Sequence, residues 1–68
     1  MSNQNSVSFT MIEAVGNISV AYTIYLKNRN VTRTETVGSE VQKDDIEYDK
    51  LPNHLIKAYQ AWLMNLKP

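Results

Sequence analysis

The chain of 68 residues contains no cysteine and only one histidine. Without cysteine it can form no disulfide, offers no thiolate to a metal and has no thiol nucleophile. The single histidine, His54, leaves too few ligands for a classical zinc site. A body this small buries little apolar area per residue, so its fold usually needs an additional source of stability. With disulfides and zinc set aside, we expect self-association, and a homo-oligomer.

An excess of charge of one sign is also lacking. Seven Lys and Arg residues balance seven Asp and Glu residues, so no net field attracts the chain to nucleic acid or to an anionic membrane. Residues 1–6 contain no basic side chain and no apolar run follows them, and no window approaches the roughly 20 apolar residues of a membrane span. We therefore expect a cytoplasmic protein with no membrane partner.

Alternating apolar residues predict two paired strands, at about 6–15 and 18–27. Gly16-Asn17 between them suits a two-residue hairpin turn, since glycine accepts a positive φ without steric cost. This turn puts Phe9 opposite Ile24 and brings both apolar sets to one face. The predicted core of the sheet is Val7, Phe9, Met11, Val20, Tyr22, Ile24 and Leu26.

A third strand is predicted at 31–37, and two registers compete for it. A three-residue loop over 28–30 places the threonines of this strand beside the core residues of the second strand. A two-residue loop places Arg33 and Glu35 there instead. Because desolvating two charges costs several kcal/mol unless they pair, the three-residue loop is favoured. The third strand then becomes a polar edge of the sheet.

The rest of the chain is interpreted as an acidic connector and a helix. Residues 38–50 are charged and carry few large apolar side chains, and Asp49 or a neighbour is expected to cap the helix. From 52 to 67 the apolar positions follow a helical period, with Pro52 in the first turn. The expected fold is α+β: a three-stranded antiparallel meander with one C-terminal amphipathic helix on one face (βββα). Residues 6–68 form one domain, and residues 1–5 are expected to be mobile.

No group of residues makes a convincing catalytic or metal site. Asp45, Glu47 and Asp49 would project to one side of an extended segment, as a divalent cation requires, but an acidic run before a helix is usually solvated. His54 has no nucleophile or acid fixed near it in sequence, and one sheet with one helix offers little concave space. We expect no enzyme, no cofactor and no metal.

The sheet face opposite the helix is the candidate binding surface, because nothing in the remaining chain is left to cover it. A small protein-interaction module that binds a partner protein or itself through this face or an edge strand is the preferred hypothesis. A nucleic-acid binder that uses Tyr25, Lys27, Arg29 and Arg33 is the alternative. The helix edge with Trp62 and Met64 also remains open as the surface, and the composition suits an accessory protein of a phage or mobile element. The predicted contact residues are Tyr25, Lys27, Arg29, Val31, Arg33 and Val37.

Overall fold

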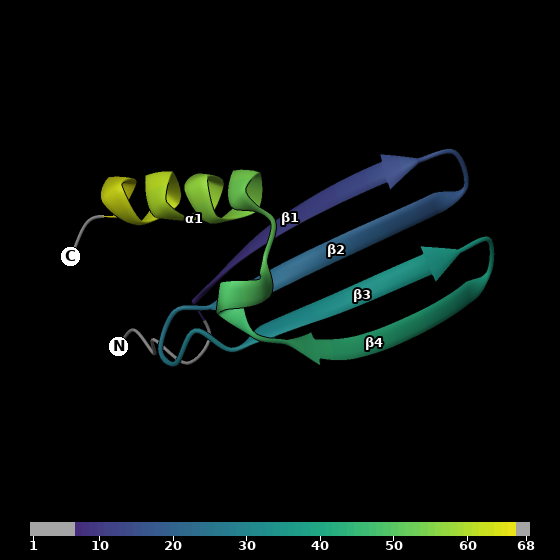
Figure 1. The fold of residues 1–68 in the computed structure, drawn as a ribbon, viewed down its shortest axis with the longest axis horizontal. Coiled ribbons are helices and arrows are strands. Elements are labelled where there is room, and N and C mark those ends of the chain that lie inside the picture. The colour runs from purple at the N-terminus through teal and green to yellow at the C-terminus, as the bar shows by residue number, and fades with distance from the viewer. Residues whose placement is uncertain (1–6, 67–68) are drawn as a thin grey trace.

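The computed structural model describes residues 7–66 as one antiparallel sheet and a C-terminal helix (Figure 1). The sheet is a meander in the order β1-β2-β3-β4. The predicted α+β class, with an antiparallel sheet and one C-terminal helix, is therefore confirmed, but the predicted number of strands is wrong. The N-terminal residues 1–5, predicted to be mobile, lie outside the described residues. The elements are β1 (Ser8–Val15), β2 (Ile18–Tyr25), β3 (Val31–Val37), β4 (Glu40–Ile46), the 3-10 helix η2 (Tyr48–Lys50) and α1 (Asn53–Asn65).

The first hairpin has the predicted register. Phe9 pairs with Ile24, and Val15 pairs with Ile18 across a two-residue turn. Gly16 has a φ of 59°, the left-handed region that a turn with glycine at its first central position requires. Both apolar sets of the hairpin therefore lie on the same side of the sheet, where α1 packs.

The register of β3 differs from the favoured prediction. Ile24 pairs with Val31 and Tyr22 with Arg33, so the longer connection over 26–30 reverses the parity that a three-residue loop would give. Val31 is only 2% exposed and fills the core. Arg33 and Glu35 lie on the helix side, where Arg33 Nη2 donates to Glu35 Oε1 at 3.1 Å. Their side chains stay 28% and 29% exposed, so the expected desolvation cost is largely avoided.

The predicted acidic connector at 38–50 contains the fourth strand. Gly38, with a φ of 61°, and Ser39 form a second two-residue turn, which pairs Val37 with Glu40 and Val31 with Ile46. Because β4 pairs with β3, the third strand is an inner strand and not the edge that we predicted. The charged side chains of β4 are exposed. Such charges on an edge strand oppose pairing with another sheet.

Helix α1 closes the core over one end of the sheet. It begins at Asn53, after Pro52 as the N-cap, and its first turn has no side-chain cap, because Asp49 lies in η2. Figure 1 shows α1 over the end where β1 begins, while the two hairpin turns project away from it. In the described residues no helix has the length and apolarity needed to cross a membrane. The buried core residues of the described chain are Ile24, Val31, Leu51, Leu55 and Tyr59.

Aromatic rings join the helix to the sheet. The Phe9 ring centroid lies 5.9 Å from that of Tyr59 and 5.5 Å from that of Trp62. Phe9, Met11 and Tyr22 pack against the buried core as predicted. Val7, Val20 and Leu26 are half-buried, as Phe9, Met11 and Tyr22 are, so Ile24 is the one predicted core residue of the sheet that is fully buried. The core is thus concentrated under α1 and does not extend along the whole sheet.

Candidate interaction surface

The pairing register assigns alternate residues of each strand to two faces. Ile24 and Val31, which are buried under α1, mark the helix side. The opposite side is called the outer face here, and no described helix or strand covers it. The outer face consists of Ser8, Thr10, Ile12, Ala14, Ser19, Ala21, Thr23, Tyr25, Thr32, Thr34, Thr36, Val41, Lys43 and Asp45.

Charge is distributed over the two faces in an unusual way. On β1, β2 and β3 the outer face carries no charged side chain, whereas the helix side carries Glu13, Arg33 and Glu35. The only charged residues of the outer face are Lys43 and Asp45 on the edge strand β4. A half-covered antiparallel sheet ordinarily turns its polar side to water and its apolar side to the core. Here the uncovered face is the uncharged one.

The centre of the outer face is built from small and β-branched side chains. Thr10, Thr23 and Thr32 lie side by side across three strands, and the hydroxyl oxygens of Thr10 and Thr23 are 3.1 Å apart, within hydrogen-bond distance. Larger apolar side chains stand around this centre: Ile12 is 66% exposed and Val41 is 60% exposed. The outer face of β1, β2 and β3 is therefore uncharged and partly apolar.

The helix-side charges of β1 and β3, namely Glu13, Arg33 and Glu35, contact partners within the chain. Hydrogen bonding by the Tyr22 side chain raises the pKa of Arg33 above its ordinary value, desolvation works against this, and Glu35 adds to the increase. Glu13 on β1 contacts the ring Nε2 of His54, at the start of α1. The contact of His54 with Glu13 thus joins the start of α1 to β1.

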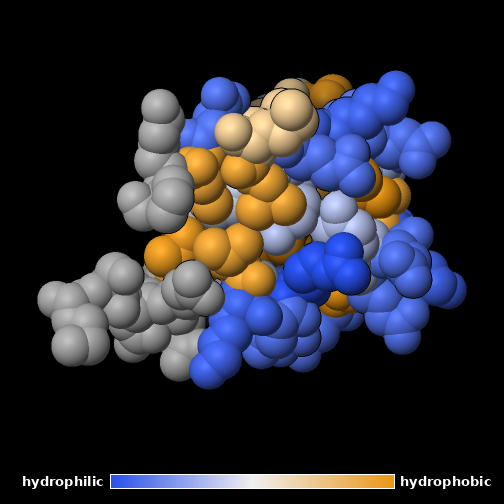
Figure 2. Space-filling model, turned by 90° about the vertical axis from the view of Figure 1, so that its left-hand side faces the viewer, coloured by the Kyte–Doolittle hydropathy of each residue, from blue (hydrophilic) through white to orange (hydrophobic). Residues whose placement is uncertain are grey.

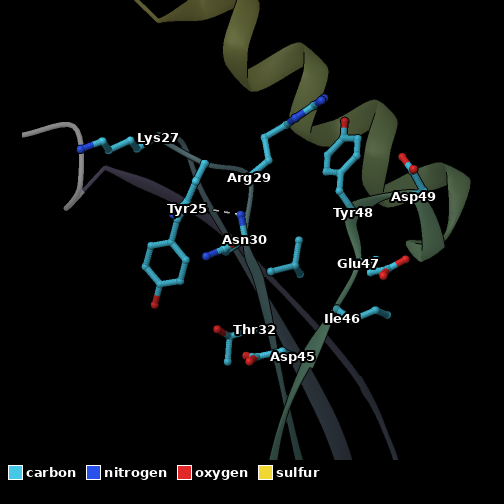
Figure 3. A pocket seen from close by; sticks show the side chains of 12 residues that line it. Tyr25, Lys27, Arg29, Asn30, Thr32, Asp45, Ile46, Glu47, Tyr48 and Asp49 are labelled. Atoms are coloured by element: carbon cyan, nitrogen blue, oxygen red, sulfur yellow. Dashed lines mark hydrogen bonds between the residues drawn. The ribbon is translucent and has the colours of Figure 1, made fainter.

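An open groove with a volume of about 870 Å³ surrounds the loop between β2 and β3 and the end of β4 (Figure 3). Figure 3 shows that its side chains do not converge: Tyr25 and Asp45 point to one side of the strands, and Arg29 points to the other side, toward Tyr48. The Arg29 guanidinium carbon lies 4.8 Å from the centre of the Tyr48 ring. This cation–π contact fixes the loop to η2 but leaves no enclosed pocket.

The acidic residues of this region do not form a cation site. Strand β4 ends at Ile46 and the chain turns into η2, so Asp45, Glu47 and Asp49 do not project to one side as an extended segment would allow. Across residues 7–66 no three His, Asp or Glu side chains are grouped so that they could hold a metal ion. The geometry needed for the metal alternative is not present there.

The structure brings together some of the predicted contact residues and separates others. Tyr25, Lys27 and Arg29 line the groove, and Val31 lies at its buried base. Arg33 and Val37 lie on the helix side, so our placement of Val31, Arg33 and Val37 on the outer face is wrong. The reason is the register of β3. Sequence reasoning therefore missed the threonines of β3, Thr32, Thr34 and Thr36, as outer-face residues.

A sequence signal for the missed strand was present. Gly38-Ser39 follows a valine, as Gly16-Asn17 does, and both glycines sit at the first central position of a two-residue turn. Reading the second pair as a hairpin turn would have predicted β4 and, with Ile46 opposite Val31, the parity of β3. The four charged residues among the seven of β4 hid this signal.

Comparison with protein-family models, with curated proteins and with solved structures finds no match to this chain.

Proposed function

We propose that this protein is a small non-catalytic interaction module that binds a partner protein, or a second copy of itself, through the outer face of its sheet. The observation that carries the proposal is the absence of charge on the outer face of β1, β2 and β3. The core of a protein interface is depleted of charged residues, whereas an ordinary solvated face is not.

The side chains of the outer face are of kinds that suit binding to a partner. Its centre is formed by short threonine, serine and alanine side chains, which lose little conformational entropy when they are covered. Exposed Ile12 and Val41 supply apolar area, and Tyr25 at the margin is 37% exposed. Aromatic side chains are enriched at interfaces because they combine apolar area with a polar group.

The edges of the sheet support the outer face as the preferred surface. Lys43, Asp44 and Asp45 protect the β4 edge from pairing with another strand. The start of β1 lies beside α1, and the Phe9 side chain packs on the helix. Strand addition is therefore the weaker form of the interaction hypothesis.

The nucleic-acid alternative loses support from the positions of the basic residues. Arg33 is on the helix side and is bound to Glu35. Lys27 and Arg29 share their groove with Asp45, Glu47 and Asp49, and these carboxylates would repel a phosphate backbone.

We propose a cytoplasmic setting, and an accessory role for a phage or mobile element, on composition alone.

A charge placed at the centre of the outer face tests the proposal. We expect Ala21→Arg to weaken binding to the partner that co-purifies with the wild-type chain by roughly tenfold or more, because a desolvated charge is costly. Gln42→Arg is the matched control, since Gln42 is an exposed position on the helix side of the same sheet. Equal binding by the wild type and by a folded Ala21→Arg variant would contradict the proposal.

A further inference from the structure

A row of exposed apolar side chains lies on the helix side, beyond the reach of α1. Val15, Ile18 and Val37 are 82%, 42% and 40% exposed. The register makes them neighbours, because Val15 pairs with Ile18 and Ile18 pairs with Val37. They are called the tip row here. Figure 1 shows that this end of the sheet, with both two-residue turns, projects past the helix.

The outward side of α1 is poor in charge. Lys57, Ala61 and Met64 follow helical spacing and are exposed, with Met64 86% exposed. They are called the helix stripe here. Among the thirteen residues of α1 none is acidic, and Lys57 and His54 are its only basic or titratable groups besides Tyr59. Figure 2 looks at the end of the molecule where α1 ends and shows hydrophobic residues in the middle of this end, with hydrophilic residues around them.

The two surfaces are complementary in charge as well as in polarity. The tip row is flanked by the exposed Glu40 on β4, which pairs with Val37, whereas Glu13 in the adjacent row of β1 is bound to His54 of the same chain. Opposite charges across an interface favour one orientation of the partners. Lys57 is the charge that the helix stripe offers to Glu40 of the other copy. A flexible methionine such as Met64 adapts to an apolar surface that it covers.

We propose that two copies of this chain associate through their helix sides, so that the helix stripe of each copy covers the tip row of the other. The arrangement has a twofold axis and uses the same two surfaces from each copy. It supplies the additional apolar burial that so small a core calls for. It leaves both outer faces exposed on opposite sides of the dimer, so it stands independently of the proposed function.

Glutamate substitutions on the two faces of β1 test the surface. In a sedimentation series over micromolar concentrations we expect a dimer for the wild type, and roughly a tenfold or greater rise in the dimer dissociation constant for Val15→Glu. Ile12→Glu is the matched control, because Ile12 is an exposed β-branched residue on the outer face of the same strand. A wild type that stays monomeric at high micromolar concentration overturns the dimer but not partner binding by the outer face.

Cysteine pairs test the reciprocal geometry, which the lack of native cysteine makes simple. Mixing Val15→Cys with Met64→Cys chains under oxidation is expected to give a disulfide-linked heterodimer between them. Mixing Ile12→Cys with Met64→Cys chains is expected to give none. A dimer that Ile12→Glu disrupts, or one that links Ile12→Cys and not Val15→Cys to Met64→Cys, overturns the helix-side arrangement and assigns self-association to the outer face.

Discussion

The two faces of the sheet differ in how much of each is covered and in where each carries its charged residues. The helix side combines a small apolar core under α1 with charges that pair inside the chain, as Arg33 does with Glu35. The outer face has neither a cover nor a charge on its first three strands. A face that only needed to stay in water would gain solubility from charged side chains. The buried core therefore lies on the helix side, and the uncharged strands of the outer face are the basis of our proposal that this face binds a partner.

Truncating the core should give the largest effect on stability. Leu55 is fully buried, and we expect Leu55→Ala to lower the free energy of unfolding by about 2–5 kcal/mol, through lost apolar burial and a cavity. Urea denaturation measures this. Thr34→Ala on the outer face is the comparison and should change stability by no more than about 0.5 kcal/mol. Similar losses of unfolding free energy in the two variants would show that the outer face contributes as much to stability as the buried core, and would contradict the comparison.

Substitutions at Arg29, whose backbone is in the left-handed conformation, should change stability by a smaller amount, in a direction that depends on the new residue. Arg29 has a φ of 57° and contacts the Tyr48 ring. We expect Arg29→Gly to be more stable than Arg29→Ala by about 1 kcal/mol, because glycine adopts this conformation without strain. Both variants lose the cation–π contact, so the difference between their stabilities measures the cost of the left-handed backbone conformation for a residue with a Cβ. Thermal unfolding of both variants checks the order, and an alanine variant as stable as the glycine variant would contradict it.

The ion pair between Arg33 and Glu35 on the helix side should have a small coupling energy. Arg33 and Glu35 remain partly exposed, so solvent screens their attraction, and a double-mutant cycle with Arg33→Met and Glu35→Gln should give about 0.2–1 kcal/mol. The coupling energy should fall as salt is added. A coupling that salt does not alter would show that the pair is more deeply desolvated than its exposure indicates.

Stability should decline in strongly basic solution because of Tyr59. Burial, and to a lesser degree Tyr48, raises the pKa of Tyr59 above the ordinary value of 10.0, while Arg29 lowers it. The folded state therefore retains the proton longer than the unfolded state. The stabilisation is complete below the ordinary value and is lost as the pH rises from about 10 toward the folded-state pKa.

Denaturation midpoints measured at about pH 8 and about pH 11 test this sign. Tyr59→Phe is the control, because it keeps the buried ring and removes the titrating hydroxyl. The variant should lose less stability than the wild type over this interval. An equal loss in both chains would assign the effect to other groups.

The sequence predicted the parts of the fold that follow from local pattern. The β1–β2 register follows from strict alternation around Gly16-Asn17, and the helix follows from its apolar period. The position of Arg33 and Glu35 could not be derived in this way. Their position depends on how far α1 extends over the sheet, which a local sequence pattern does not predict. It also depends on the ion pair between Arg33 and Glu35, which lowers the cost of desolvating them. The candidate surface was identified as an uncovered face, but its threonines on β3 depended on that same register.

Photo-crosslinking from single positions tests the central claim most directly. A photoreactive side chain at Thr34, in the middle of the outer face, should give a discrete covalent product with a partner protein or a second copy in the native host. The same group at Lys50, an exposed position in η2, should give none. A product from Lys50 and none from Thr34 would contradict the claim that the outer face is the binding surface.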